Sequence, residues 1–178
     1  MKKSIFIKAL IFLLFFINTD VYARGFIIEG NKYTDDDIVI SIIDEIPDID
    51  VKSKSNFILK KLIKSNLFKS VEVAYDSKNY IIKIIEHPSI NKFFYTNNER
   101  IKDEDIDNIV EELELYTLSE TKINLLIEEL TKIYQSFGYN NIQIEYKSEV
   151  YSNNSSNVYI DFKEGEITKI NKITFQCL

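Results

Sequence analysis

The most constraining feature of this sequence is a short pattern that occurs twice and begins a third time. Residues 26–31 (FIIEGN) and residues 93–98 (FFYTNN) each precede an acidic run that opens a helical pattern. Residues 173–175 (ITF) start the pattern again, three residues before the end of the sequence. The copies are 67 and then 80 residues apart. A period of that size indicates consecutive small domains rather than the turns of a solenoid.

Residues 1–23 have the pattern of a secretion signal. Two lysines near the start are followed by an apolar stretch at 5–17, interrupted only by Lys8, and then by residues 21–23 (VYA), a small-x-Ala cleavage pattern. The alternative is an uncleaved membrane anchor, but the apolar stretch is shorter than the roughly 18–20 residues that span a bilayer. We therefore expect cleavage after Ala23 and export of the remainder.

The composition of the remainder limits its partners and its means of stabilisation. The chain has a net charge of −6, and removing residues 1–23, with three lysines and one aspartate, leaves −8. Such a surface argues against nucleic acid as a partner, because binding to phosphates relies on cationic side chains. The single cysteine, Cys177, excludes an intrachain disulfide. Burial of hydrophobic residues, 45% of the sequence, must therefore stabilise the domains.

The first domain is expected at residues 24–88. Its first strand, at 25–29, ends in a Gly-Asn turn. Thr34 is expected to cap the helix that follows, with aspartates in the first turn, where they favour the helix dipole. The apolar residues of this helix recur at helical spacing until Pro47.

The rest of the first domain predicts one helix and two strands. The helix is expected over 55–66. Residues 71–75 alternate between apolar and polar side chains, which indicates a half-buried strand. Residues 81–85 are apolar on both faces, as in a central strand. The predicted element order is β-α-α-β-β.

The second domain, expected at residues 89–165, repeats that order. The second of its two helices has the clearest pattern in the chain, with apolar residues at helical spacing from Ile123 to Phe137 and an end at Gly138. This stripe could face a partner, but such a stripe more often packs on its own sheet, and we expect it in the core. The strands of the second domain are expected at 91–95, 142–146 and 158–162.

The joins between the domains are short. His87-Pro88 and Gly165-Glu166 separate the units without a Gly/Ser-rich linker. Short joins restrict how far neighbouring domains tilt, so we expect a semi-rigid array. Residues 166–178 are expected to be the start of a third domain.

Five pieces of the sequence, taken in order, resemble a known family. They are residues 28–31 (IEGN), 67–73 (LFKSVEV), 86–90 (EHPSI), 134–139 (YQSFGY) and 164–165 (EG). No single piece is specific, but together they cover almost all of the chain after the secretion signal. In order and spacing they resemble the POTRA domains of BamA-type outer-membrane protein assembly factors.

The resemblance implies an α+β fold of tandem POTRA domains, each a three-stranded mixed sheet packed on two helices. It implies a periplasmic array that is attached to the outer membrane through a barrel domain. The implied role is to receive unfolded outer-membrane β-barrel proteins and to dock accessory lipoproteins for insertion into the outer membrane.

Two positions depart from the family pattern. Asn97-Asn98 replaces the usual Gly-Asn, a change that is tolerated because Asn enters the left-handed conformation more readily than most residues. Cys177-Leu178 stands where the third unit should read Gly-Asn. We therefore expect a truncated product or a fragment, whose contact with a membrane would depend on the missing barrel.

No catalytic residue, metal site or cofactor site is predicted. His87 is the only histidine, and without a nucleophile or acid partner nearby we expect a solvated linker side chain. Cys177 is expected to be a loose thiol. The acidic runs 35–37 and 103–105 lack the alternating ligand spacing of a calcium loop, and we expect them to serve the starts of helices.

The predicted functional feature is the backbone of two strands. In a three-stranded sheet of this order, the strand that follows the helices lies at an edge and leaves N–H and C=O groups unpaired. An extended client segment can add there by β-augmentation, with little demand on its sequence. The alternative is that these edges are only solvated. The candidate edge residues are Val71, Glu72, Val73, Ala74, Tyr75, Ile142, Gln143, Ile144, Glu145 and Tyr146.

Two alternative functions are also open. A two-partner secretion transporter or a TamA-like translocation transporter would contain similar domains, and few such units before the barrel would favour it. A secreted enzyme with unrecognised chemistry belongs to a different class. It would need a convergent polar site, which the sequence does not indicate.

Overall fold

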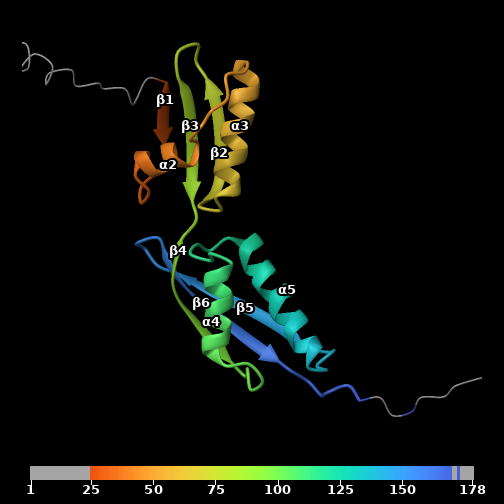
Figure 1. The fold of residues 1–178 in the computed structure, drawn as a ribbon. Helices are drawn as coiled ribbons and strands as arrows, with labels where there is room; N and C mark the ends of the chain where they lie inside the picture. The colour runs from red at the N-terminus through yellow and green to blue at the C-terminus, as the bar shows by residue number, and fades with distance from the viewer. Residues whose placement is uncertain (1–24, 170–171, 173–178) are drawn as a thin grey trace, which may run out of the picture.

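The computed structural model describes residues 25–169 and residue 172. The predicted secretion signal at 1–23 and most of the predicted third domain at 166–178 lie outside the described residues. The described chain forms two units that follow one another and are connected by a short segment (Figure 1).

The first unit contains three strands and two helices. In chain order its elements are β1 (Phe26–Glu29), α2 (Asp36–Ile42), α3 (Val51–Lys64), β2 (Phe68–Tyr75) and β3 (Tyr80–Glu86). The second unit repeats this arrangement. Its elements are β4 (Ser89–Thr96), α4 (Asp103–Glu112), α5 (Glu120–Ser136), β5 (Gln143–Val150) and β6 (Ser155–Lys163).

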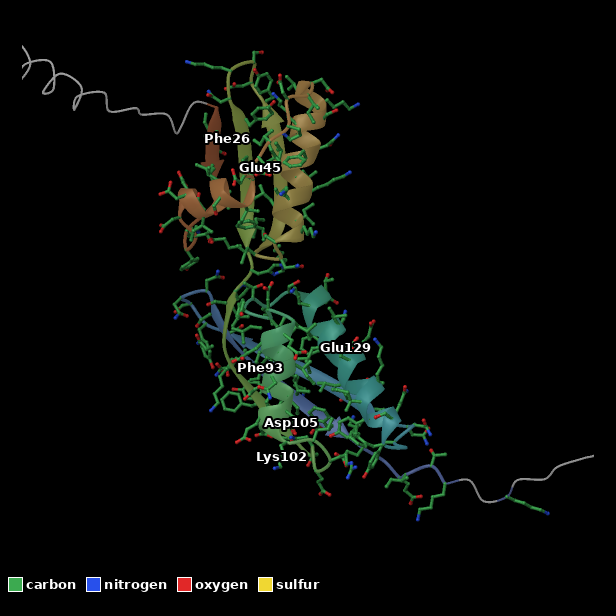
Figure 2. The ribbon with its side chains drawn as sticks, viewed as in Figure 1. Phe26, Glu45, Phe93, Lys102, Asp105 and Glu129 are labelled. Carbon is green, nitrogen blue, oxygen red and sulfur yellow. The ribbon has the colours of Figure 1, made fainter. Side chains whose placement is uncertain are left out.

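Each unit has a mixed sheet whose central strand is the last one in sequence. The orders are β1-β3-β2 and β4-β6-β5. The first strand of each unit runs parallel to the central strand, and the strand after the helices runs antiparallel to it. Phe26 on β1 and Phe93 on β4 therefore occupy equivalent places in the two units (Figure 2). The predicted α+β fold, with the order β-α-α-β-β, is confirmed.

Each unit has its own hydrophobic core between its helices and one face of its sheet. The core of the first unit is formed by Val39, Ile43, Ile58, Leu62, Phe68, Ile82 and Ile84. The core of the second unit is larger. It is formed by Ile101, Ile106, Leu115, Ile123, Leu126, Leu130, Tyr134, Val158, Ile160 and Phe162.

The apolar stripe of α5 packs into the second core, as the sequence predicts. Ile123, Leu126, Leu130 and Tyr134 are completely buried. Phe137, the last residue of the stripe, is 44% exposed and lies under the guanidinium of Arg100, 4.2 Å from the ring centroid. The stripe is therefore a packing surface, with a cation–π contact at its end.

The first helix differs from the prediction at both ends. The N-cap position of α2 is Asp35 rather than Thr34, and its side chain makes no capping hydrogen bond. The helix ends at Ile42, well before Pro47, and Glu45 takes a left-handed conformation with φ of 60°. A left-handed residue interrupts the helix, so the last apolar residues before Pro47 follow outside it.

The second helix begins earlier than predicted because a capping residue, and not the first apolar residue of the pattern, sets its start. The Asp50 carboxylate accepts a hydrogen bond from the Ser53 N–H at 3.1 Å, and α3 starts at Val51 rather than at residue 55. The pKa of Asp50 lies below its usual value, with the hydrogen bonds from Ser53 as the main cause. The helix ends at Lys64, and Asn66 takes a left-handed conformation with φ of 56°.

Within residues 25–169 and 172, no helix covers the outer face of either sheet (Figure 1). In β3, Ile82 and Ile84 point into the core, whereas Ile85 is 59% exposed. The apolar residues on both faces of this strand correctly predicted its central place in the sheet. They did not predict burial of both faces, because the helices cover only one.

Candidate functional site

The repeated Gly-Asn pattern forms the turn between the first strand and the first helix of each unit. In the first unit, the Asn31 side-chain amide donates to the Thr34 carbonyl at 3.0 Å and to the Asp36 carboxylate at 2.5 Å. Gly30, just before it, has φ of 95°. The turn therefore depends on one left-handed residue and one bridging amide.

The second unit builds the same turn 67 residues later. The Asn98 amide donates to the Ile101 carbonyl at 2.9 Å and to the Asp103 carboxylate at 2.8 Å. Asn97 replaces glycine and has φ of 62°, as expected from the tolerance of Asn for this conformation. Aspartates at these helix starts therefore hold the turns in place, in addition to favouring the helix dipole.

A glutamate at the end of each central strand fixes the same turns from the other side. The Glu86 carboxylate accepts from the N–H groups of Lys32 and Tyr33 at 3.0–3.1 Å. Burial raises the pKa of Glu86, but hydrogen bonds from Thr34, Lys32 and Tyr33 outweigh it and hold the pKa below its usual value. In the second unit, the Glu164 carboxylate accepts from the Arg100 N–H at 2.9 Å.

These repeated polar residues are structural. Their hydrogen bonds close within each unit and satisfy backbone groups that a turn would otherwise leave unpaired. Among residues 25–169 and 172, no three metal-ligating side chains converge on one point. The acidic runs at 35–37 and 103–105 therefore form no such cluster in the structure. Cys177 lies outside the described residues.

The two candidate edge strands lie at sheet edges. Among the strands that the structure describes, β2 is paired only with β3 and β5 only with β6, so one flank of each has no partner strand. Residues 71–75 lie within β2, and residues 143–146 lie within β5. Ile142 lies one residue before β5 and packs partly against the second core.

Each edge strand is longer than the sequence predicted. β2 also includes Phe68, Lys69 and Ser70, and β5 continues to Val150. The register shifts between Phe68 and Ser70, so alternation of apolar and polar residues is broken at the start of β2. This break hid the first residues of the strand. Both strands are eight residues long, which is enough to present a continuous row of backbone groups.

The other edge of each sheet is less open to an added strand. β1 is only four residues long. β4 is eight residues long, but Ser89 at its start forms an isolated antiparallel bridge with Thr117. The longest free edges of the described chain are therefore β2 and β5.

In the first unit α3 packs along β2, so a segment added to β2 would lie beside a helix (Figure 1).

Charged side chains on both edges oppose uncontrolled pairing. In β2, Lys69 and Glu72 are exposed. In β5, Glu145 pairs with Lys163 of the neighbouring β6 at 2.7 Å, and both side chains are exposed. Charges on edge strands are a common protection against aggregation, so these side chains disfavour pairing of the edges between copies of the chain.

The outer face of the second sheet has an aromatic pair that sequence reasoning missed. Phe94 and Tyr159 are parallel neighbours on β4 and β6, with ring centroids 5.0 Å apart and planes at 11°. The Lys92 ammonium lies 4.9 Å from the Phe94 ring centroid. Cross-strand register was the missing signal, because only the parallel pairing of two distant strands brings these residues together.

His87 lies at the junction of the two units rather than in solvent. It is half-buried and lines a cavity of about 310 Å³ together with Tyr33, Tyr116 and Asn153. The pKa of His87 lies below its usual value because burial disfavours the charged imidazole, and the charge of Lys69 adds to that effect. The expectation of a solvated linker side chain is therefore wrong.

His87 is expected to titrate below 6.5, and its signals are unambiguous in an NMR titration because it is the only histidine. Since burial disfavours the charged imidazole in the folded state, the contribution of His87 to stability is expected to be fully present above the pKa of the unfolded chain and to be lost as the pH falls through the folded pKa. Lys69→Gln should raise the pKa of His87, and Lys83→Gln, which removes an exposed charge from β3, should not. A pKa at or above 6.5 would contradict this assignment.

Within the described part of the chain, none of the helices combines the length and the apolar character needed to cross a bilayer. The predicted join at His87-Pro88 is short in the structure: only these two residues separate β3 from β4.

Comparison with known proteins agrees with this fold. Residues 88–165 match the POTRA family (surface antigen variable number repeat). The N-terminal domain of Omp85 from the cyanobacterium Thermosynechococcus elongatus is similar over 84% of this chain and 71% of that one, with 16% identity and a TM-score of 0.52. A search of curated proteins with this sequence gave no significant match.

Two further solved structures resemble the chain more distantly. POTRA1-2 of the periplasmic domain of Omp85 from Anabaena matches over 82% of this chain and 96% of that one, with 15% identity and a TM-score of 0.49. BamA POTRA3-5 from Haemophilus influenzae matches over 81% of this chain and 66% of that one, with 9% identity and a TM-score of 0.45. The family match at 88–165 and the similarity to the Omp85 N-terminal domain, together with the repeated sheet topology, support an α+β fold of the POTRA type for the described chain.

Proposed function

We propose that this chain is a periplasmic, non-catalytic binding region that captures unfolded outer-membrane β-barrel proteins through its free strand edges. The observation that carries the proposal is the pair of eight-residue edge strands, β2 and β5, each with one unpaired flank. Main-chain pairing suits a receptor of many clients, because every non-proline residue of a client supplies the same donor and acceptor.

The wider setting of the proposal is a BamA-type assembly factor. Its POTRA region would also dock accessory lipoproteins, and its attachment to the outer membrane would be made by a barrel domain. Support for export comes from the sequence pattern of residues 1–23, and support for the domain type comes from the family match at 88–165. The division into domains at 24–88 and 89–165 is part of the same proposal.

Paired proline substitutions test the two edges. Successive residues of an edge strand point their N–H groups to opposite flanks. Of two single proline substitutions at neighbouring positions, one therefore removes a backbone hydrogen bond to the central strand, and the other removes only an N–H donor on the unpaired flank. The pairs are Glu72→Pro with Val73→Pro in β2, and Glu145→Pro with Tyr146→Pro in β5. In each pair, one variant should unfold its unit and the other should stay folded.

The folded member of each pair decides the proposal. A labelled peptide of about 10 residues with the alternating pattern of a barrel strand serves as the client probe, and amide shifts of the chain report where it binds. We expect shifts along β2 or β5 in the original chain and their loss in the folded proline variant of that strand. Shifts confined to other elements, or binding that both folded variants retain, would overturn edge binding.

A further inference from the structure

The buried polar side chains of the described chain are gathered at one place. Three polar residues are buried: Ser119, Ser155 and Ser156, with 3%, 5% and 0% exposure. All three belong to the second unit and lie where it meets the first unit or the join between them. Buried polar groups are costly unless they are paired, and a fully paired set favours one arrangement over its alternatives.

The turn between α3 and β2 receives two hydroxyl groups from the second unit. The Thr117 hydroxyl donates to the Asn66 carbonyl at 2.8 Å, and the Ser119 hydroxyl donates to the Asn66 side-chain carbonyl at 3.4 Å. Asn66 is left-handed, and its side-chain amide donates to the Lys64 carbonyl at 3.1 Å. Asn66 is thus held within its own unit while it accepts from the other.

Ser119 makes its side-chain hydrogen bond to the first unit instead of capping its own helix. The residue occupies the N-cap position of α5, where a serine side chain ordinarily accepts from the first turn of the helix. Its side chain makes no such capping bond. The hydroxyl is instead directed across the boundary to Asn66. The first turn of α5 therefore lacks a capping hydrogen bond from Ser119, and the interface between the units has one more hydrogen bond.

The join itself is bracketed from both sides by the second unit. On one side, the Leu118 N–H donates to the Pro88 carbonyl at 2.8 Å, and Thr117 bridges Ser89. On the other side, the Ser89 N–H donates to the Asn154 carbonyl at 2.9 Å, and the Asn154 amide donates to the His87 carbonyl at 3.3 Å. The join therefore has little freedom to rotate.

Two further hydrogen bonds hold the join, one to the first unit and one within the second unit. The His87 N–H donates to the Leu67 carbonyl at 2.9 Å, next to Asn66. The Ser156 hydroxyl donates to the Ser89 carbonyl at 3.1 Å, which satisfies the completely buried serine. Among the described residues, no buried side-chain nitrogen or oxygen atom is left without a partner. The polar network at the junction is therefore fully paired.

We propose that Asn66, Thr117 and Ser119 form an inter-unit clamp that locks the two units into one orientation. Neighbouring domains with small polar interfaces ordinarily move relative to one another. Here the join is bracketed by backbone contacts, and the clamp adds side-chain hydrogen bonds between the units directly beside it. Together these contacts restrict bending at the join and twisting about it. The inference concerns geometry between the units and does not depend on the proposed client binding.

Distances between spin labels on the two units test the clamp. Cys177→Ser removes the only natural thiol, and Lys60→Cys on α3 and Glu111→Cys on α4 place labels at exposed positions of different units. The labelled chain with Asn66, Thr117 and Ser119 unchanged should give one narrow distribution of the distance between the labels. In the variant Thr117→Val with Ser119→Ala, the distribution should become at least about twofold wider, as expected for domains joined without a fixed interface.

A matched variant controls for the loss of hydroxyl groups. Thr131 and Ser136 make the same kinds of bond within α5, to the Ile127 and Ile133 carbonyls. Thr131→Val with Ser136→Ala should leave the distribution narrow. The proposal is overturned if the original chain already gives a broad distribution, or if the clamp variant is as narrow as this control.

A second variant decides the matter if the first one fails to fold. Asn66→Gly keeps the left-handed turn, because glycine adopts positive φ without strain, and removes the acceptor of Ser119. Its distribution should be wider than that of the original chain, and Thr117→Ser, which keeps a hydroxyl, should remain narrow. Asn66→Gly keeps the backbone carbonyl that accepts from Thr117, so the deciding variant combines it with Thr117→Val, and a narrow distribution in that double variant would overturn the clamp.

Discussion

Replacing Gly30 with alanine is expected to destabilise the first unit more than any exposed substitution in it. A Cβ atom at this position would collide with the Ile84 carbonyl oxygen of the central strand, and that oxygen is backbone and has little freedom to move. The residue also has φ of 95°, which side chains rarely adopt. Strain and overpacking together should lower the free energy of unfolding by about 2–6 kcal/mol. Urea denaturation of the two chains measures the difference.

Gly165 is a matched control for the strain part of this effect. It has φ of 68°, but a Cβ atom there would meet only the backbone and side chain of Asn141 at 3.8 Å or more. Gly165→Ala should therefore cost only the left-handed strain of about 1–2 kcal/mol. Equal losses in the two variants would show that the approach of Gly30 to β3 does not matter.

Replacing Tyr134 with alanine is expected to be the most damaging change in the second unit. Its ring is completely buried. The ring centroid lies 5.8 Å from that of Tyr139, in an edge-to-face arrangement, and 5.6 Å from that of Phe162. Its hydroxyl donates to the Glu164 carboxylate at 2.8 Å. Loss of an aromatic side chain from a core costs about 3–5 kcal/mol, and thermal or urea unfolding of the second unit would show it.

Two further tyrosine variants separate packing from the hydrogen bond. Tyr134→Phe keeps the ring and removes only the bond to Glu164, so the free energy of unfolding should fall by about 1–2 kcal/mol. Tyr116→Ala removes a ring that is 63% exposed and should stay within about 0.5 kcal/mol of the original chain. If Tyr134→Phe were as damaging as Tyr134→Ala, the hydrogen bond rather than packing would hold this corner of the core.

The sequence predicted the order of the elements because each one has a local cause. The stripe of α5 follows the 3.6-residue period of a buried helix, and the alternation in β6 follows the two-residue period of a strand. The resemblance to POTRA domains implied the three-stranded sheet, and the apolar residues on both faces of 81–85 favoured a central place for β3. In such a sheet the strand that follows the helices lies at an edge, which gave both candidate edges without any special residue type.

The ends of the elements were harder to predict because they depend on single contacts. Asp50 starts α3 four residues before the expected position, through one hydrogen bond to Ser53. The β6 strand begins at Ser155, three residues before its expected start at residue 158, because the second unit buries Ser155 and Ser156 against the join. Local pattern carries no sign of such tertiary burial.

The clamp could not be predicted from the sequence for the same reason. Asn66 and Thr117 are 51 residues apart, and neither belongs to a motif that indicates their contact. Ser119 looked like an ordinary residue at the start of a helix. Only the packing of the second unit against the α3–β2 turn shows that its hydroxyl serves another partner.

The passage from β3 to β4 has a mechanical consequence. Only two residues separate these strands, so the central strand of the first sheet continues almost directly into an edge strand of the second. A pull along the chain at β4 reaches the first unit at its best-supported strand, which is paired on both sides. The force is resisted in shear along two strand pairings rather than by peeling an edge. Tension between the units is thus carried by backbone, and in the first sheet it is shared between the pairings of β3 with β1 and with β2.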